Sequence, residues 1–284
     1  MFDTYERSRF LGKPIHLFLF MRQNLTWRYA SADRDVVVGG HTYVAAQIER
    51  GEIKQTAERA KDKLTIKVAY LRDPSAVDYP VTQSLGDNWH PFTPSDQVRV
   101  ICLSMHEGDA AAPIVEWSGV VTQPKFGDVE LELTCEPTNG LSRARQQGPK
   151  WQRACWKTVY SQGIRGCNLP VDAAKVGATL SGVAGATVSA AEFATSPFPL
   201  GGGYLTWVRT DGLVERRTIM AHSGNTISLL YGASDLDPGL AVIALPGCPR
   251  TWAACEARGN TANYGGSVYK PIKNPMEGVS MSWG

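Results

Sequence analysis

The chain contains 284 residues, of which 43% are hydrophobic and 20% are charged, a balance typical of globular domains. Its 29 basic and 27 acidic residues give a formal charge of +2, which excludes the strong basic excess of a dedicated nucleic-acid-binding surface. No apolar run is long enough to span a bilayer as a helix, so we expect no transmembrane segment, and the chain length suggests two domains.

The N-terminal half predicts a succession of antiparallel strands. Residues 14–21 form an apolar run of strand length, and residues 25–30 alternate as a strand does. The dipeptide Gly39-Gly40 favours a tight hairpin between its flanking segments. Further strands are predicted at 52–56, 64–68, 97–103, 114–121 and 129–135. Turn signals about every ten to fifteen residues are typical of an antiparallel sandwich or barrel.

A polar segment from about residue 136 to 151 lacks β-alternation and indicates a domain boundary. We therefore expect an N-terminal β-rich domain at 1–140 and a C-terminal domain at 141–284. Within the second domain a small β-barrel is predicted at about 170–246, where Asp211-Gly212 suggests a two-residue hairpin. The predicted fold class is mainly β, with two barrel-like or sandwich-like domains.

Four cysteines bracket this predicted barrel and are interpreted as one site. Cys155 and Cys167 form a C-x11-C pair before the barrel, and Cys248 and Cys255 form a C-x6-C pair after it. Two disulfides, a structural zinc, an iron–sulfur cluster and four unlinked core thiols are the possible interpretations. No signal peptide is apparent, so we expect a reducing cytosol, which disfavours disulfides.

The spacing and the flanking residues favour a cluster over zinc. Structural zinc sites usually take two ligands from a C-x2-4-C turn, which neither pair contains, whereas a cluster spans a larger distance between loops. Cations near the cysteines are expected to offset thiolate charge, and neighbouring aromatic side chains are expected to exclude water. The cations are Arg153, Lys157, Arg165, Arg250 and Arg258, and the aromatic residues are Trp151, Trp156, Trp252 and Tyr264.

The residues around these cysteines resemble the C-terminal signature of tail-tip hub proteins of long-tailed bacteriophages and gene transfer agents, a group that includes the lambda minor tail protein L. The matching stretches, all in the C-terminal half of the chain, are Cys155-Trp-Lys, Cys167-Asn-Leu-Pro-Val-Asp, Gly247-Cys-Pro-Arg-Thr-Trp-Ala-Ala-Cys-Glu-Ala-Arg-Gly-Asn and Asn263-Tyr-Gly-Gly. Two departures are visible: Arg258 meets Gly259 with no aromatic residue between them, and Ser267-Val-Tyr stands where the family has Phe-Pro.

The resemblance implies that Cys155, Cys167, Cys248 and Cys255 hold an iron–sulfur cluster, [4Fe-4S] in type, with zinc as the alternative metal. It also implies a structural hub, homotrimeric, that is made in the bacterial host cytoplasm and resides at the virion tail tip. Such a hub joins the distal tail protein to a central fibre or receptor-binding protein, meets the tape-measure protein and closes the tail channel.

The alternative function is an enzyme, either a cluster-dependent redox enzyme or a tail-associated cell-wall hydrolase. Neither Gly-x-Ser-x-Gly nor His-Glu-x-x-His occurs in the sequence, and no pair of carboxylates can be placed in one cleft. The histidines, at positions 16, 41, 90, 106 and 222, have no metal-ligand spacing. Cys102 and Cys135 lie in alternating apolar segments and are predicted to be buried thiols rather than ligands. We therefore expect a protein without catalytic residues.

Overall fold

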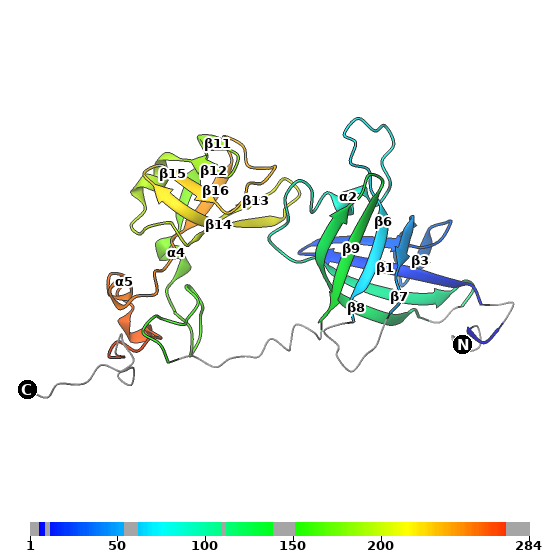
Figure 1. Cartoon of the computed structure of the whole chain (residues 1–284), viewed down its shortest axis with the longest axis horizontal. Coiled ribbons are helices and arrows are strands. Elements are labelled where there is room, and N and C mark those ends of the chain that lie inside the picture. Colours follow the sequence, from blue (N-terminus) through cyan, green and yellow to red (C-terminus); the bar gives the residue numbers. More distant parts are fainter. Residues whose placement is uncertain (1–5, 9–11, 54–61, 110–111, 139–150, 271–284) are drawn as a thin grey trace, which may run out of the picture. The chain divides into compact units, whose positions relative to one another are not determined.

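The computed structural model of the chain describes residues 6–8, 12–53, 62–109, 112–138 and 151–270 (Figure 1). The prediction of a mainly β chain is confirmed: the strands form two sheets, and the helices are short. The chain divides into two compact units, Met1–Arg145 and Gln146–Gly284. No helix within the described ranges is long and apolar enough to cross a membrane.

The first unit is a nine-stranded sheet with the order β3-β4-β2-β1-β7-β8-β9-β6-β5. Neighbouring strands run antiparallel except β2 and β4, which run parallel. The strands are β1 (Pro14–Arg22), β2 (Leu25–Ala30), β3 (Val36–Val38), β4 (His41–Ala45), β5 (Ile48–Arg50), β6 (Leu64–Ala69), β7 (Arg99–His106), β8 (Ile114–Phe126) and β9 (Glu130–Pro137). A short helix, α2 (Gln83–Gly86), packs Leu85 into the core of this unit.

Side chains alternate between the core and the outer face along these strands, as the period of two requires. In β7 every second residue is buried, including Val100 and Cys102. The main core is completed by residues such as Phe18, Ile66 and Leu133, each 0% exposed. Irregularities between Cys102 and Leu103 in β7, and within β8, interrupt the register. Such bulges increase twist and bending, and Figure 1 shows that the sheet of the first unit is strongly curved.

The Gly39-Gly40 hairpin is confirmed. Val38 pairs with His41, so the two glycines form the whole loop, and both have positive φ values, 57° and 78°. Right-handed strand twist favours this left-handed turn, and glycine adopts it without steric cost.

The prediction of a strand at 52–56 is wrong for residues 52 and 53, the part of this range that the structure describes. The strand that pairs with β6 at the edge of the sheet is β5, which ends at Arg50. Glu52 and Ile53 lie outside any strand, and 54–56 lie outside the described residues. Ile48, only 2% exposed, fills the core position opposite Val68. Burial of Ile48 therefore sets the register of this edge strand.

The second unit is a seven-stranded sheet with the order β10-β16-β13-β14-β15-β12-β11. Its strands are β10 (Val176–Thr179), β11 (Gly182–Ala184), β12 (Thr187–Ser189), β13 (Tyr204–Val208), β14 (Val214–Ser223), β15 (Thr226–Leu229) and β16 (Ala241–Leu245). The two end strands, β10 and β11, are consecutive in the chain and separated by only Leu180 and Ser181. The sheet therefore curls back on itself as an open barrel, with no pairing between β10 and β11 among the described residues, around a core that includes Phe193, Leu205 and Ile219.

The hairpin predicted at Asp211-Gly212 has a longer loop than expected. Val208 pairs with Val214, which leaves residues 209–213 in the loop rather than two. Arg209 N–H donates to Leu213 O at 2.9 Å, and Gly212 takes a positive φ of 81°. The Asp-Gly pair thus marks the turn correctly but not its length.

Candidate metal centre

The chain enters and leaves the barrel of the second unit side by side. β10 and β16 pair antiparallel, with Val176 opposite Ala244. Next to them, the Tyr160 hydroxyl donates to Pro246 O at 2.8 Å, and Cys155 N–H donates to Arg250 O at 2.8 Å. Burial raises the pKa of Tyr160 to about 12, so its hydroxyl remains a donor at neutral pH. These contacts join the segments that carry the two cysteine pairs.

The structure brings the four predicted ligands to one cavity of about 20 Å³. Cys155, Cys167 and Cys255 are 8–9% exposed, and Cys248 is partly exposed. All six cysteines of the chain are described and are free thiols. The cavity is also lined by Lys157, Val159, Leu169, Arg250, Thr251, Arg258, Asn263 and Tyr264.

A short helix presents the last thiol. α5 (Trp252–Glu256) begins after Thr251, whose hydroxyl accepts from Ala254 N–H at 3.2 Å and so caps the helix. Cys255 lies on its buried side, and a 3-10 turn, η3 (Thr261–Asn263), follows it. The cap and the turn fix the direction in which the Cys255 thiol points.

The loops around the thiols have unusual backbone conformations. Among the described non-glycine residues, positive φ occurs at Gln23 and at three positions in these loops: Tyr160, Asn168 and Arg250. Left-handed backbone costs roughly 1–2 kcal/mol for a residue with a Cβ, and it persists where surrounding contacts impose it. Its concentration beside the cysteines is typical of a functional site.

The double glycine of the sequence motif has a steric role. A Cβ on Gly266 would lie 2.2 Å from Arg153 O, so only glycine fits there. Gly265 N–H donates to Cys155 Sγ at 3.3 Å, and the Tyr264 hydroxyl donates to Arg153 O at 2.6 Å. The 264–266 segment therefore packs directly on the first cysteine.

Polar groups also contact two other sulfurs. Asn260 Nδ2 lies 3.5 Å from Cys167 Sγ, and the Cys255 thiol donates to Asn260 O at 3.1 Å. Burial, followed by the three neighbouring thiols, raises the pKa of Cys255. A metal must displace the thiol proton, so binding at this site depends on pH.

The predicted cations and aromatic residues are only partly placed at the cavity. Lys157, Arg250 and Arg258 line it. Arg258 is engaged in structural contacts: its guanidinium donates to Gly247 O at 2.7 Å and to Ala254 O at 3.1 Å, and it stacks 4.4 Å above the Phe198 ring.

Of the predicted aromatic residues, Tyr264 lines the cavity, and Trp252 packs edge-on against it at 5.3 Å. The expectation is wrong for Trp151. That side chain is 72% exposed and lies under the Lys270 ammonium, so it does not exclude water from the sulfurs.

The donor set is chemically suited to a soft metal. The lining contains four thiols and no His, Asp or Glu, a composition that favours zinc or iron–sulfur clusters over magnesium or calcium. Within the described part of the chain, no three His, Cys, Asp or Glu side chains are arranged as a single-ion site. The residues therefore fit a thiolate-bound group in donor type, and the identity of that group stays a prediction.

The two remaining cysteines are buried, as predicted. Cys102 and Cys135 are 0% exposed in the sheet core of the first unit. Burial raises the pKa of Cys102 to about 12 and raises that of Cys135 as well. Both thiols therefore stay protonated at neutral pH and serve as core side chains.

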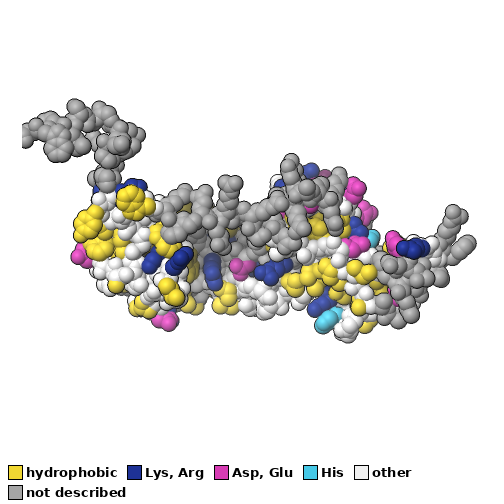
Figure 2. Space-filling model, turned by 90° about the horizontal axis from the view of Figure 1, so that it is seen from below, with side chains coloured by type: hydrophobic (Ala, Val, Ile, Leu, Met, Phe, Trp, Pro, Cys, Tyr) yellow, Lys and Arg dark blue, Asp and Glu magenta, His cyan; other side chains and the backbone are white. Residues whose placement is uncertain are grey.

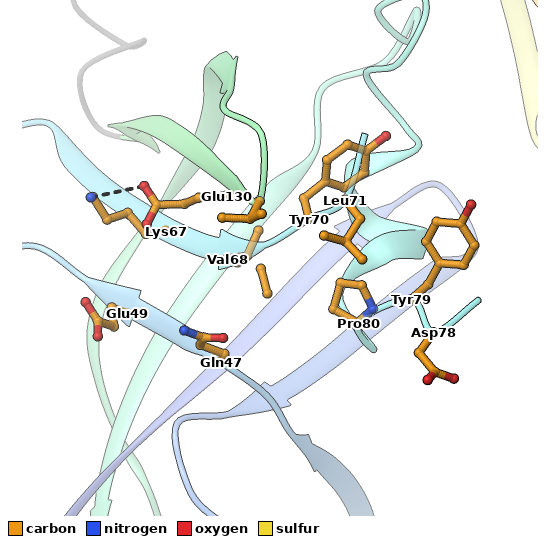
Figure 3. A pocket seen from close by; sticks show the side chains of 12 residues that line it. Gln47, Glu49, Lys67, Val68, Tyr70, Leu71, Asp78, Tyr79, Pro80 and Glu130 are labelled. Atoms are coloured by element: carbon orange, nitrogen blue, oxygen red, sulfur yellow. Dashed lines mark ion pairs between the residues drawn. The ribbon is translucent and has the colours of Figure 1, made fainter. Parts of the chain in front are cut away.

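A larger hollow of about 510 Å³ lies in the first unit, near β5 and β6 (Figure 3). Glu130 on its wall is paired with Lys67 at 3.1 Å. Figure 3 shows Glu49 and Asp78 at opposite ends of the group of lining side chains. The histidines are also dispersed: His16 lies near Glu116, and His106 contacts Glu6.

Charges of both signs are distributed over the face drawn in Figure 2, with apolar side chains between them. This distribution agrees with the small formal charge of +2. The expectation of no specific nucleic-acid binding remains a prediction.

Three comparisons with known proteins each found a similarity. Residues 200–274 match a family model described as "Phage conserved hypothetical protein BR0599", a region that includes Cys248 and Cys255. A chain in the structure titled "Virion of native gene transfer agent (GTA) particle" has a TM-score of 0.70 and 16% identity, covering 99% of this chain and 98% of that one. At this identity the similarity concerns the fold.

The third similarity extends over the whole sequence. A protein of Xylella fastidiosa (strain 9a5c), described as uncharacterized, is 31% identical, and the match covers 100% of both chains. The chain belongs to the same family as this Xylella fastidiosa protein.

Proposed function

We propose that this protein is a structural component of a phage-like or gene-transfer-agent virion. Two findings support the proposal: the fold similarity to a chain of a gene transfer agent virion, and the match of residues 200–274 to a family described from phages. The sequence also contains neither Gly-x-Ser-x-Gly nor His-Glu-x-x-His, so no catalytic motif argues for an enzyme. The proposal is therefore a structural role rather than an enzymatic one.

Within the virion, the proposed position is the tail tip, where the protein serves as a homotrimeric hub. This finer assignment rests on the resemblance of the cysteine-bearing segments to tail-tip hub proteins. In that position the protein joins the distal tail protein to a central fibre or receptor-binding protein, contacts the tape-measure protein and closes the tail channel.

The proposed role of the cysteines is to hold a [4Fe-4S] cluster through Cys155, Cys167, Cys248 and Cys255. The observation that carries this proposal is that four thiols from two segments, one before the barrel and one after it, line one cavity. A bound cluster supplies bonds to all four thiolates, so its binding free energy becomes folding free energy of the second unit. Zinc is the alternative metal, and metal analysis separates the two.

The virion assignment is tested by locating the protein in particles. An epitope inserted between Thr210 and Asp211, which are exposed residues of the 209–213 hairpin loop, is labelled with gold-conjugated antibody and viewed by electron microscopy. We expect gold at the tail tip, and deletion of the gene should give particles whose tails lack a closed tip. Label on the head or tube, or normal tips without the protein, would contradict the hub role.

In a second experiment, the purified protein is assayed for hydrolysis of peptidoglycan in a zymogram. We expect no clearing. Clearing that survives replacement of all four cysteines would instead support the hydrolase.

A further inference from the structure

Three asparagine side chains form a hydrogen-bonded series beside the thiols. Asn168 Nδ2 donates to Asn263 Oδ1 at 3.1 Å, and Asn263 Nδ2 donates to Asn260 Oδ1 at 2.8 Å. Asn260 Nδ2 then donates to Cys167 O at 2.7 Å and approaches Cys167 Sγ at 3.5 Å. Since Asn168 follows Cys167 directly in the chain, the series closes a ring on that cysteine.

Backbone groups at both ends determine which way each amide points. Gly163 N–H, a donor only, bonds to Asn168 Oδ1 at 2.9 Å, so the Nδ2 of Asn168 must face Asn263. At the other end Cys167 O is an acceptor only, so Asn260 presents Nδ2 to it. The orientations of all three asparagine amides are therefore determined, and an N–H group of Asn260 lies beside Cys167 Sγ.

Asn260 also holds the other cysteine segment. Its backbone N–H donates to Cys255 O at 3.0 Å, and its carbonyl accepts from the Cys255 thiol at 3.1 Å while that thiol is protonated, so the backbone N–H bond is the one that a metal-bound site would retain. The residue is only 8% exposed. A single side chain and its backbone thus connect two thiols that lie on opposite sides of the barrel in the sequence.

We propose that Asn260 is the positioning residue of the four-thiol site, which sets the placement of Cys167 relative to Cys255 and donates an N–H bond to the Cys167 sulfur. The inference rests on the proposed function, because it assumes that these thiols bind a metal group. Outer hydrogen bonds of this kind orient ligands, and their loss typically costs about 10–100-fold in metal affinity. N–H donors to ligand sulfurs also raise the reduction potential of an iron–sulfur cluster, because they stabilise its more negative state.

The test compares Asn260→Ala with Asn263→Ala and with a matched control, Asn225→Ala. Asn225 is an exposed turn residue of the same unit, whose side chain contacts only Thr226 among the hydrogen bonds of the described residues. The full-length chain is purified without oxygen, and two quantities are measured: the rate of metal release to a chelator, and the midpoint potential by spectroelectrochemical titration.

We expect Asn260→Ala to release metal about tenfold faster or more, and to have a more negative midpoint potential. Asn263→Ala, which removes the N–H donor to Asn260 Oδ1 but leaves the bond from Asn260 Nδ2 to Cys167 O, should shift both quantities in the same direction by less. Asn225→Ala should match the wild type. Unchanged release and potential in Asn260→Ala would overturn the proposal, as would equal effects of the Asn260 and Asn263 variants on release with no change in potential.

If Asn260→Ala loses its metal during purification while Asn263→Ala keeps it, the positioning role is supported. Asn260→Leu then provides the potential measurement, because it keeps a similar side-chain volume and removes the donor to Cys167 without adding a charge. A normal potential in Asn260→Leu would overturn the sulfur hydrogen bond. If the proposed metal binding itself is wrong, the wild-type chain will contain no metal at all. That result differs from every outcome that would overturn the role of Asn260 alone.

Discussion

The two units use the same side chain in opposite ways. In the first unit Cys102 and Cys135 lie on inward positions of β7 and β9, are 0% exposed, and have pKa values raised by burial. In the second unit four thiols lie on loops and a short helix around one cavity, where N–H groups approach two of the sulfurs. A cysteine on a buried strand position is a core side chain, whereas cysteines gathered by loops are available as ligands.

The contrast also concerns how each thiol is held in place. Sheet register alone fixes the strand cysteines: Cys102 is opposite Phe18 in β1, and Cys135 is opposite Leu64 in β6. The loop cysteines depend on side-chain caps, glycine contacts and amide hydrogen bonds. Substitutions should therefore affect the two groups through different quantities.

The largest effect is expected from Cys→Ser at the loop positions. Replacement of Cys155, Cys167, Cys248 or Cys255 removes a soft anionic ligand, so the bound metal should be lost and the thermal transition of the second unit should move to lower temperature. Metal content by mass spectrometry and calorimetry measure this. Cys102→Ser, the matched control, should keep wild-type metal content while the first unit loses about 1–3 kcal/mol from an unsatisfied buried hydroxyl. Loss of metal in Cys102→Ser would contradict the assignment of Cys102 as a core side chain rather than a ligand.

The next effect concerns the glycine before Cys248. A Cβ on Gly247 would lie 2.2 Å from Gly201 O, so Gly247→Ala must separate two backbone segments. We expect a loss of about 3 kcal/mol in the urea unfolding of the second unit, together with weaker metal binding. Gly177→Ala is the control, since nothing lies within 4 Å of its Cβ position, and it should be close to neutral. A wild-type unfolding midpoint in Gly247→Ala would show that this backbone contact does not position Cys248.

The buried strand thiols should make the unfolding stability of the first unit depend on pH. The pKa of Cys102 rises from 9.0 to about 12 on folding, so the folded state retains a proton that the unfolded state loses. Stability from this group is complete below pH 9 and decreases as the pH rises from 9 toward 12. The urea midpoint of the first unit should therefore fall between pH 7.5 and pH 10, and the slope should be smaller in Cys102→Ala. Equal slopes in the two proteins would contradict burial of this thiol.

The smallest effect is expected at Arg258, which joins the end of α5 to the barrel. Arg258→Lys keeps the positive charge near the cavity but loses the planar contact with Phe198 and one of the two carbonyl bonds. We expect a loss of about 1 kcal/mol in unfolding of the second unit, with metal content retained. Loss of metal at unchanged stability would indicate that the guanidinium acts on the thiolates instead.

Much of the fold is accessible from the sequence because strands repeat with a period of two. The alternation at 97–103 predicts β7, and Gly39-Gly40 predicts its hairpin since few residues accept φ > 0 at both loop positions. The edge strand β5 and the loop at 209–213 escape prediction because register there depends on tertiary pairing of Ile48 and Val208. Local pattern does not determine such pairings.

The candidate site is predictable in part. Spacing and resemblance identify the four cysteines, but the asparagine series depends on the approach of the 160–168 loop to η3. Asn168, Asn260 and Asn263 all stand within the motifs that carry the resemblance, yet nothing in the sequence says that their side chains meet. Their short sequence separation from Cys167 and Cys255 could have indicated a role beside these thiols, because an asparagine side chain offers both a hydrogen-bond donor and an acceptor.

The most direct test of the central claim is analysis of metal and acid-labile sulfide in the full-length protein purified without oxygen. The account predicts about four iron and four sulfide per chain, as a [4Fe-4S] cluster held by four thiolates requires. The same analysis of Cys102→Ser should give the wild-type values, and that of Cys167→Ser should not. One zinc with no sulfide, or a folded second unit that binds neither iron nor sulfide, would contradict the iron–sulfur site.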